Sequence, residues 1–256
     1  MKKMAFACLI LLFSLASAFA AESRETMTLS SSGCTALSIE SGAGDLKVQG
    51  EEGRERIDVI AVIRVRGMGD AELREFKKEN IILKLEKIGS KAVLIARIDE
   101  KFSLEKLFGN QNAYIDLEVI MPSRLDLVVE DGSGDTDIRS LAGRLDLEDG
   151  SGDATLEGIS GPVAIEDGSG DLFLAGLQGN VEIEDGSGDI DLKNAGGDVF
   201  IEDGSGEIFV KGVKGSLKID DGSGDIEIDG VEKDVNIEEA GSGDLEILNV
   251  KGKVRK

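Results

Sequence analysis

One turn sequence recurs through the C-terminal half of this chain at a nearly constant interval. Copies of the triplet Gly-Ser-Gly begin at Gly132, Gly150, Gly168, Gly186, Gly204, Gly222 and Gly241. All intervals between them are equal except the last, which is longer by one residue. A short fixed period of this kind is typical of a solenoid, in which each repeat forms one coil and neighbouring coils share a core.

Between the triplets, apolar residues alternate with polar ones, as in "DLFL" (171–174) and "NVEIE" (180–184). A period of two indicates β-strands with one face turned inward. Aligned repeats give five nearly all-aliphatic columns, which start at Thr136, Ile138, Leu141, Leu145 and Leu147. We predict an all-β fold over residues 129–256: a right-handed parallel β-solenoid, similar to a β-helix or β-roll, of about seven 18-residue coils with two short strands each.

The glycines recur because every coil must turn at the same place, and glycine accepts a positive φ at little steric cost. Asp and Ser side chains in such turns accept hydrogen bonds from nearby backbone amides. A second turn column starts at Gly143. The spacing of the glycines does not indicate a nucleotide site, because no phosphate-binding loop motif is present and the glycines do not precede helices.

The segment 21–128 is predicted to be β-rich with one short helix. "LSIESGAGDLKVQG" (37–50) is a degenerate first copy of the repeat, with Leu37, Ile39, Leu46 and Val48 facing inward. Strands are expected at 57–66, 81–87, 92–98 and 113–120, and a loop at 99–112. "DAELREFKKEN" (70–80) predicts a helix with Asp70 as its N-cap. We expect this segment to cover the N-terminal end of the stack; a separate binding domain is the alternative.

Residues 1–20 have the pattern of a secretory signal peptide. Lys2 and Lys3 precede an apolar run, and Ala18-Phe19-Ala20 resembles a cleavage site. We therefore expect an exported protein, in the periplasm or at the cell surface, without membrane insertion after cleavage. Cys34 is then the only cysteine left. We interpret it as a small buried apolar residue, with an intermolecular disulfide as the alternative.

Negative charge is concentrated in the repeats. Residues 130–250 carry 32 acidic and 7 basic residues. Such a surface repels nucleic acid and anionic membranes and attracts cations or basic partners. Acidic residues form three columns: Glu130, Glu148, Glu166, Glu184 and Glu202; Asp131, Asp149, Asp167, Asp185, Asp203 and Asp221; and Asp135, Asp153, Asp171, Asp189, Glu207, Asp225 and Asp244.

Neighbours in such a column lie about 5 Å apart and repel by roughly 3 kcal/mol at an effective dielectric constant of about 20. We interpret the carboxylates as solvated turn residues bonded to their own backbone. Binding of Ca²⁺ is the alternative. The known calcium repeat would place Leu172 at its aspartate ligand, and an EF-hand loop would start at Val129. Neither motif fits, and we assign no metal or cofactor site.

The signal peptide, the single "GAGDLKVQG" copy, the strand–helix–strand segment and the tandem repeats such as "VEIEDGSGDIDL" (181–192) resemble one bacterial family. It is a family of candidate adhesins built from β-strand repeats, a domain of unknown function. The resemblance spans nearly all of the chain after the signal peptide. It implies a β-solenoid at the cell envelope and supplies no catalytic residues.

The favoured function is therefore a non-enzymatic adhesion, scaffold or interaction module, whose partner is an unidentified protein or polysaccharide of the cell envelope. Phe173 and Phe209 are predicted to face outward on one sheet, two coils apart, as a possible partner surface; Phe200 faces outward on the other sheet. A cation-binding module is the alternative.

An enzyme and an ice-binding protein are the weaker alternatives. A β-helix polysaccharide lyase or hydrolase needs tuned acid and base groups, whereas the chain has no histidine and the repeats have few basic residues. Clustering of Arg139, Lys211 and Lys218 in a cleft would favour it. Ice binding is disfavoured because the outward columns mix Asp, Phe, Glu, Lys and Thr. The oligomeric state is not predicted.

Overall fold

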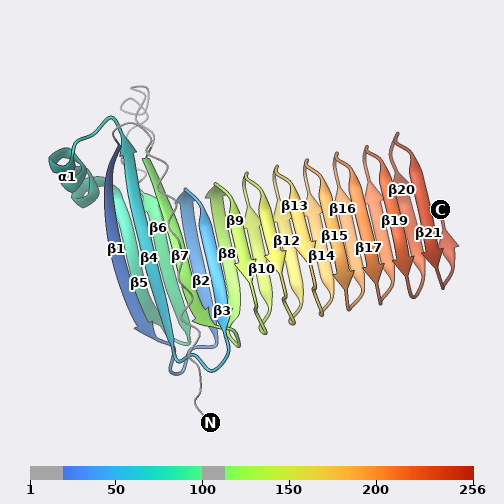
Figure 1. The fold of residues 1–256 in the computed structure, drawn as a ribbon, viewed down its shortest axis with the longest axis horizontal. Coiled ribbons are helices and arrows are strands. Elements are labelled where there is room, and N and C mark those ends of the chain that lie inside the picture. Colours follow the sequence, from blue (N-terminus) through green and yellow to red (C-terminus); the bar gives the residue numbers. More distant parts are fainter. Residues whose placement is uncertain (1–19, 100–112) are drawn as a thin grey trace, which may run out of the picture.

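The computed structural model describes residues 20–99 and 113–256 and arranges most of them in two long β-sheets (Figure 1). The expected signal peptide, up to residue 19, and nearly all of the loop expected at 99–112 lie outside the described residues. Sheet A contains, in spatial order, β1 (Ala20–Ser30), β4 (Arg56–Arg66), β7 (Ala113–Pro122), β3 (Leu46–Glu51), β9 (Thr136–Arg139), β11 (Ala154–Glu157), β13 (Leu172–Ala175), β15 (Ile190–Ala195), β17 (Ile208–Val213), β19 (Ile226–Val231) and β21 (Leu245–Val250). Sheet B contains β22 (Val254–Arg255), β20 (Val235–Ala240), β18 (Leu217–Asp221), β16 (Val199–Asp203), β14 (Val181–Asp185), β12 (Val163–Asp167), β10 (Leu145–Asp149), β8 (Asp126–Ser133), β2 (Ala36–Ala43), β6 (Lys91–Ile98) and β5 (Ile81–Ile88).

Each repeat contributes one strand to each sheet, and successive coils pair in parallel with equivalent residues side by side. Leu145 pairs with Val163, and Leu156 pairs with Leu174, in each case the equivalent residue of the next repeat. The predicted β-solenoid is confirmed. Its regular register means that a residue type chosen in one coil lies beside the same type in the next coil.

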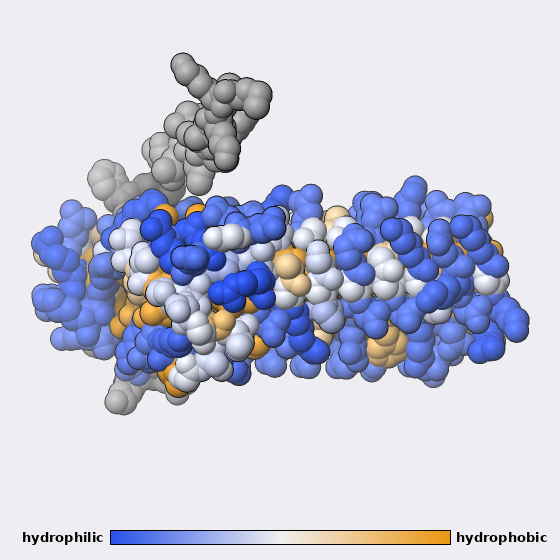
Figure 2. Space-filling model, turned by 90° about the horizontal axis from the view of Figure 1, so that it is seen from below, coloured by the Kyte–Doolittle hydropathy of each residue, from blue (hydrophilic) through white to orange (hydrophobic). Residues whose placement is uncertain are grey.

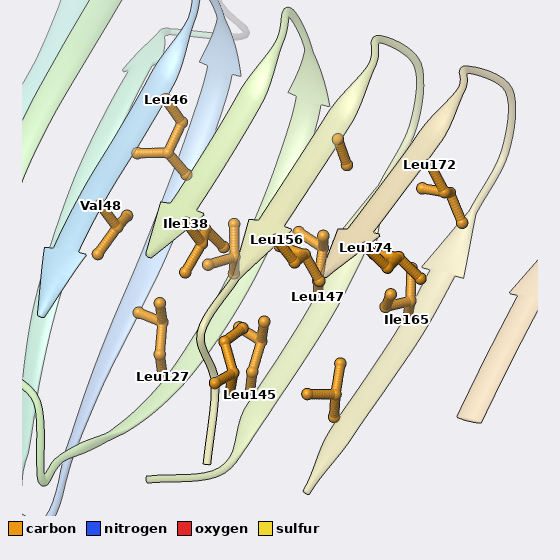
Figure 3. Close-up of a cluster of buried hydrophobic side chains, with 14 of the residues drawn as sticks. Leu46, Val48, Leu127, Ile138, Leu145, Leu147, Leu156, Ile165, Leu172 and Leu174 are labelled. Atoms are coloured by element: carbon orange, nitrogen blue, oxygen red, sulfur yellow. The ribbon is translucent and has the colours of Figure 1, made fainter. Parts of the chain in front are cut away.

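The core lies between the two sheets and is built from the predicted aliphatic columns. Ile138 and Leu156 from sheet A are fully buried, as are Leu145 and Leu147 from sheet B. Figure 3 shows these side chains meeting in the space between the strands. A single coil has too few such residues to form a core, so each coil is stabilised mainly by its neighbours.

The N-terminal segment continues both sheets. β2 and β3 form a coil that pairs in parallel with β8 and β9, and the predicted inward residues Leu37, Ile39, Leu46 and Val48 are buried. Antiparallel strands then extend the stack: β4 and β1 lie beyond β7 in sheet A, and β5 lies beyond β6 in sheet B. Cys34 is buried, as expected of a small apolar residue.

The short helix α1 (Asp70–Asn80) lies at this end of the molecule, against β1 and β5 (Figure 1). Its apolar side chains Leu73 and Phe76 are buried. The prediction that Asp70 is the N-cap was wrong by one residue. Gly69 occupies the N-cap in an extended conformation, and its N–H donates a 2.9 Å hydrogen bond to the Glu72 carboxylate.

The last repeat interval, which is longer by one residue, is accommodated by a bulge in β20. Ile219 pairs with Ile237, but Asp221 pairs with Ala240, so β20 has one more residue than β18 between the paired positions. A bulge of this kind keeps the inward residues on both sides of it in phase. Partly buried apolar residues therefore continue to pack against the core as far as Val250 at the C-terminal end.

The Gly-Ser-Gly corner is where backbones of neighbouring coils approach most closely. Gly188 has a φ of +144°, and a Cβ there would lie 1.8 Å from the carbonyl oxygen of Gly170. Gly158 has a φ of +68°, but a Cβ there would meet no atom within 4 Å. The first glycine is required by close packing, and the second only by its backbone conformation.

We therefore expect Gly188→Ala to destabilise the protein far more than Gly158→Ala. The first change forces two coils apart and should cost at least ~3 kcal/mol of unfolding free energy. The second introduces only left-handed backbone strain, about 1–2 kcal/mol. Urea unfolding followed by circular dichroism measures both. Equal losses in the two variants would contradict the close-packing argument.

Candidate functional site

The three acidic columns occupy three different environments at one corner of the solenoid. The outer glutamate column (Glu130, Glu148, Glu166, Glu184, Glu202) is exposed on sheet B, as predicted. The bridging column (Asp135, Asp153, Asp171, Asp189, Glu207, Asp225, Asp244) is mostly exposed and links successive coils. The N–H of Asp171 donates to the Asp153 carboxylate at 3.0 Å, and the N–H of Asp189 donates to Asp171 at 2.9 Å.

The remaining column points inward, and for it the interpretation as solvated carboxylates was wrong. We call it the aspartate ladder: Asp131, Asp149, Asp167, Asp185, Asp203 and Asp221. Each residue exposes 6% or less of its surface. The reason is the strand alternation itself: in "VEIED" (181–185), Val181 and Ile183 face the core, Glu182 and Glu184 face solvent, and Asp185 faces inward again.

The ladder is in register from coil to coil, because Asp149 pairs with Asp167, Asp167 with Asp185, and Asp185 with Asp203. At the N-terminal end its place is taken by Ser41, which pairs with Asp131. At the C-terminal end it is taken by Ala240. The ladder therefore ends at an uncharged residue on each side.

Hydrogen bonds satisfy only part of each ladder carboxyl group. The Oδ1 atoms of Asp149, Asp185, Asp203 and Asp221 accept the backbone N–H two residues on, at 2.9–3.1 Å. The Ser41 hydroxyl donates to Asp131 Oδ1. All six Oδ2 atoms, and Asp167 Oδ1 as well, are buried without a partner among the described residues.

Burial raises the pKa of the ladder carboxyl groups. Removal from water is the largest cause throughout, and the negative charge of neighbouring aspartates adds to it. The pKa rises to about 6 for Asp131, Asp149, Asp167 and Asp185, and to about 7 for Asp203. That of Asp221 is also raised by burial. Backbone N–H donors, together with the Ser41 hydroxyl at Asp131 and the Thr136 hydroxyl at Asp149, act in the opposite direction but do not cancel the burial.

The sequence did contain a signal for this site. The alternation that identifies Val181 and Ile183 as inward also assigns Asp185 to the inward face when it is continued by one step. The following Gly186 favoured a turn instead. The structure shows that β14 runs through Asp185, and that the turn begins after it.

The arrangement does not provide a ready-made metal site. Within residues 20–99 and 113–256, no set of three or more acidic, cysteine or histidine side chains is placed to hold a metal ion. Binding of Ca²⁺ by the acidic columns therefore stays an alternative hypothesis.

The predicted partner surface lies where the alternation placed it. Phe173 is 44% exposed and Phe209 is 45% exposed, both on the outer face of sheet A. Asp191 on β15 lies between them in register, paired with Phe173 on one side and Phe209 on the other. The outward position of both rings is confirmed, and their role as a contact surface stays a prediction.

The outer face of sheet B carries a groove that the sequence did not reveal. Its volume is about 570 Å³, and its lining includes Phe200, Lys218, Glu182, Asn180 and Asn236. The Lys218 ammonium lies 4.7 Å from the centre of the Phe200 ring and 2.9 Å from the Glu238 carboxylate. The groove thus combines an aromatic wall with amide, carboxylate and ammonium groups.

On the face shown in Figure 2, the surface of the solenoid is mainly hydrophilic, with isolated apolar spots. Within residues 20–99 and 113–256, no helix is long and apolar enough to cross a membrane.

The basic residues whose clustering would favour an enzyme do not come together. Arg139 pairs with Asp137 and Glu157 on sheet A. Lys211 pairs with Asp229 on the same sheet, four coils away, whereas Lys218 lies on sheet B. Each is held by a carboxylate on the surface, and the three residues do not share a cleft.

Two facing sheets of stacked parallel coils, with an acidic corner, define a β-solenoid protein. The chain belongs to the Toastrack DUF4097 family, whose model matches residues 12–253. This agrees with the resemblance to a bacterial family of candidate adhesins with a domain of unknown function. No curated protein matches the chain.

Solved structures that match most of the chain come from several bacteria. They include a candidate cell-adhesion protein from Clostridium sporogenes (14% identity, 92% of this chain and 98% of that chain covered, TM-score 0.32). A candidate adhesin from Bacteroides fragilis has 14% identity, coverage of 91% and 96%, and a TM-score of 0.43. A candidate lipid-binding protein from Parabacteroides distasonis has 17% identity, coverage of 91% and 96%, and a TM-score of 0.40.

The hydrogen bond at the N-terminal end of the ladder can be tested by mutation. Ser41→Ala leaves the Asp131 carboxyl group without its side-chain donor and should lower the unfolding free energy by about 2 kcal/mol at pH 8, where that group is ionised. Ser38→Ala, on the outward side of the same strand, should change stability by less than about 0.5 kcal/mol. Urea unfolding of both variants distinguishes them, and equal effects would contradict the role given to Ser41.

Proposed function

We propose that this protein is a non-enzymatic interaction module of the bacterial cell envelope, exported by the segment 1–20 and binding a protein or polysaccharide on the outer faces of its solenoid. The observation that carries the proposal is the placement of Phe173 and Phe209. Both rings are nearly half exposed on a hydrogen-bonded sheet, which leaves a large part of each side chain available to a partner.

Rings held in this way are suited to recognition. A phenylalanine on a stacked parallel strand loses little conformational freedom when a partner covers it, and aromatic side chains are enriched among residues that dominate binding. Asp191 between the two rings adds a polar group that can fix the orientation of a partner. The groove beside Phe200 offers a second surface of mixed character on the opposite sheet.

Adhesion or scaffolding also agrees with the resemblance of the chain to a bacterial family of candidate adhesins. Catalysis would require a general acid and base in one cleft. Arg139, Lys211 and Lys218 are each paired with a surface carboxylate, which supports the non-enzymatic function over an enzyme.

The proposal is tested by co-sedimentation of the purified chain with envelopes isolated from the bacterium that carries it, before and after protease treatment. We expect saturable binding that weakens at least about tenfold in Phe173→Ala/Phe209→Ala. Protease treatment then distinguishes a protein partner from a polysaccharide.

Two further variants serve as controls. Ile88→Ala removes another exposed apolar side chain, on the edge strand β5, and should bind as the unmodified chain does. Phe200→Ala reports on the groove of sheet B. Absence of binding to any envelope preparation, or equal binding by all variants, would contradict the proposal.

A further inference from the structure

The aspartate ladder is the least expected feature of the core, because an ionised carboxylate in an aliphatic interior is strongly disfavoured. A buried polar atom without a hydrogen-bond partner costs about 1–3 kcal/mol, and a charged one costs more. The ladder contains six such groups in one line, and all six have an Oδ2 atom without a partner among the described residues. Some ligand of these oxygens must relieve that cost.

The charged groups that shift the pKa values of the ladder are all acidic. Along the ladder, each aspartate faces the next one, and the bridging column adds Asp135, Asp153, Asp171 and Asp189 from the start of the sheet A strands. Asp45 faces Asp131 at one end, and Asp220 influences Asp221 at the other. The outer glutamates on the same strands point to solvent. None of these groups is a lysine or arginine that could neutralise the negative charge of the ladder.

A proton is the ligand that fits this geometry. A carboxylate can only accept hydrogen bonds, whereas an un-ionised carboxyl group both donates and accepts. Neighbouring ladder residues are in register, about 4.8 Å apart along the stack, so equivalent oxygens recur at the spacing at which backbone groups already bond from coil to coil. A proton on one carboxyl group can thus be directed at the oxygen of the next.

Close packing of the corner disfavours a larger ligand. A Cβ added at Gly168 or Gly186 would lie 2.6 Å from the carbonyl oxygen of the preceding coil. The described residues also hold no ready set of three metal ligands. Two shallow hollows, of about 380 and 420 Å³, are each lined by three ladder aspartates and by the outer glutamates of the same coils, but the unpartnered ladder oxygens are buried beneath them. Protons need no wider access.

We propose that the aspartate ladder is a buried proton-binding site, in which carboxyl groups of neighbouring coils take up protons from solvent and donate them to one another along the solenoid axis. The Ser41 hydroxyl closes the row at one end as a neutral donor, and Ala240 ends it at the other. In this state the ladder contributes to the cohesion of the coils.

The proposal makes stability depend on pH in a definite direction. The pKa of five ladder groups is about 6 to 7 in the folded chain, and that of Asp221 is raised as well, above the value near 3.9 of an unfolded aspartate. Between these values the folded state binds more protons than the unfolded state, so stability falls as pH rises. The loss is complete once the pH exceeds the folded values. We expect the midpoint of thermal unfolding to drop by roughly 10 °C between pH 5 and pH 8.

Asp185→Asn is the sharpest variant, because asparagine has the same shape, carries no charge and donates through its amide. It should raise the midpoint at pH 8 by ~5 °C and change it little at pH 5. Glu184→Gln removes one negative charge from the adjacent, exposed position on β14 and is the matched control. It should leave the pH dependence intact.

Infrared spectroscopy gives a direct readout of the protons. At pH 5.5 the folded chain should show the carbonyl band of un-ionised carboxyl groups, reduced in Asp185→Asn/Asp203→Asn and unchanged in Glu184→Gln. Absence of the band, or equal stabilisation by Asp185→Asn and Glu184→Gln at pH 8, would overturn the proposal. A rise in the midpoint that is selective for Ca²⁺ at pH 8 and abolished by Asp185→Asn would overturn it in favour of a metal site.

Discussion

Parallel hydrogen bonding between coils in strict register is the constraint on which the rest of this structure depends. Because Leu145 lies beside Val163, and Val163 beside Val181, every position of the repeat becomes a column that runs along the molecule. The contribution of one repeat position to stability recurs in every coil, whether it is favourable or unfavourable. The aliphatic columns and the close-packed glycine corner are the favourable case, since each adds the same burial or the same turn in every coil.

The acidic columns show how the structure accommodates the repulsion between equivalent carboxylates of successive coils. The outer glutamates are hydrated, and screening by salt reduces their repulsion. The bridging aspartates accept a backbone N–H from the next coil, so that each negative charge also holds two coils together. The ladder carboxyl groups are neither exposed to water nor fully hydrogen-bonded. Their Oδ1 atoms are largely satisfied by local N–H donors, and their Oδ2 atoms leave an imbalance that proton binding would remove.

Most of the architecture could be predicted from the sequence because periodicity reports on it directly. Ile138, Leu145 and their equivalents are found in the core where the period of two placed them. Asp185 was misplaced because its chemistry and the adjacent glycine argued for a solvated turn, although the phase of the alternation argued for the interior. Gly69 was missed because helix caps depend on local dihedral angles that a residue preference does not determine.

The groove of sheet B could not be predicted for a different reason. A groove arises from the relative size of neighbours in an outward column, where Asp146, Ala164, Glu182, Phe200 and Lys218 follow one another. The sequence identifies the column but does not determine the conformation of a long side chain within it. Lys218, for example, lies over Phe200 and reaches Glu238 on the next strand.

The contrast between inward and outward columns also indicates where specificity can reside. The inward positions repeat because the stack requires them to, so they distinguish this chain little from any other solenoid of the same period. The outward columns are free to vary from coil to coil, and here they change from alanine to phenylalanine to lysine within a few strands. A partner that recognises this protein therefore has to recognise a short stretch of a few coils on one outer face, and the remaining coils serve to hold that stretch rigid.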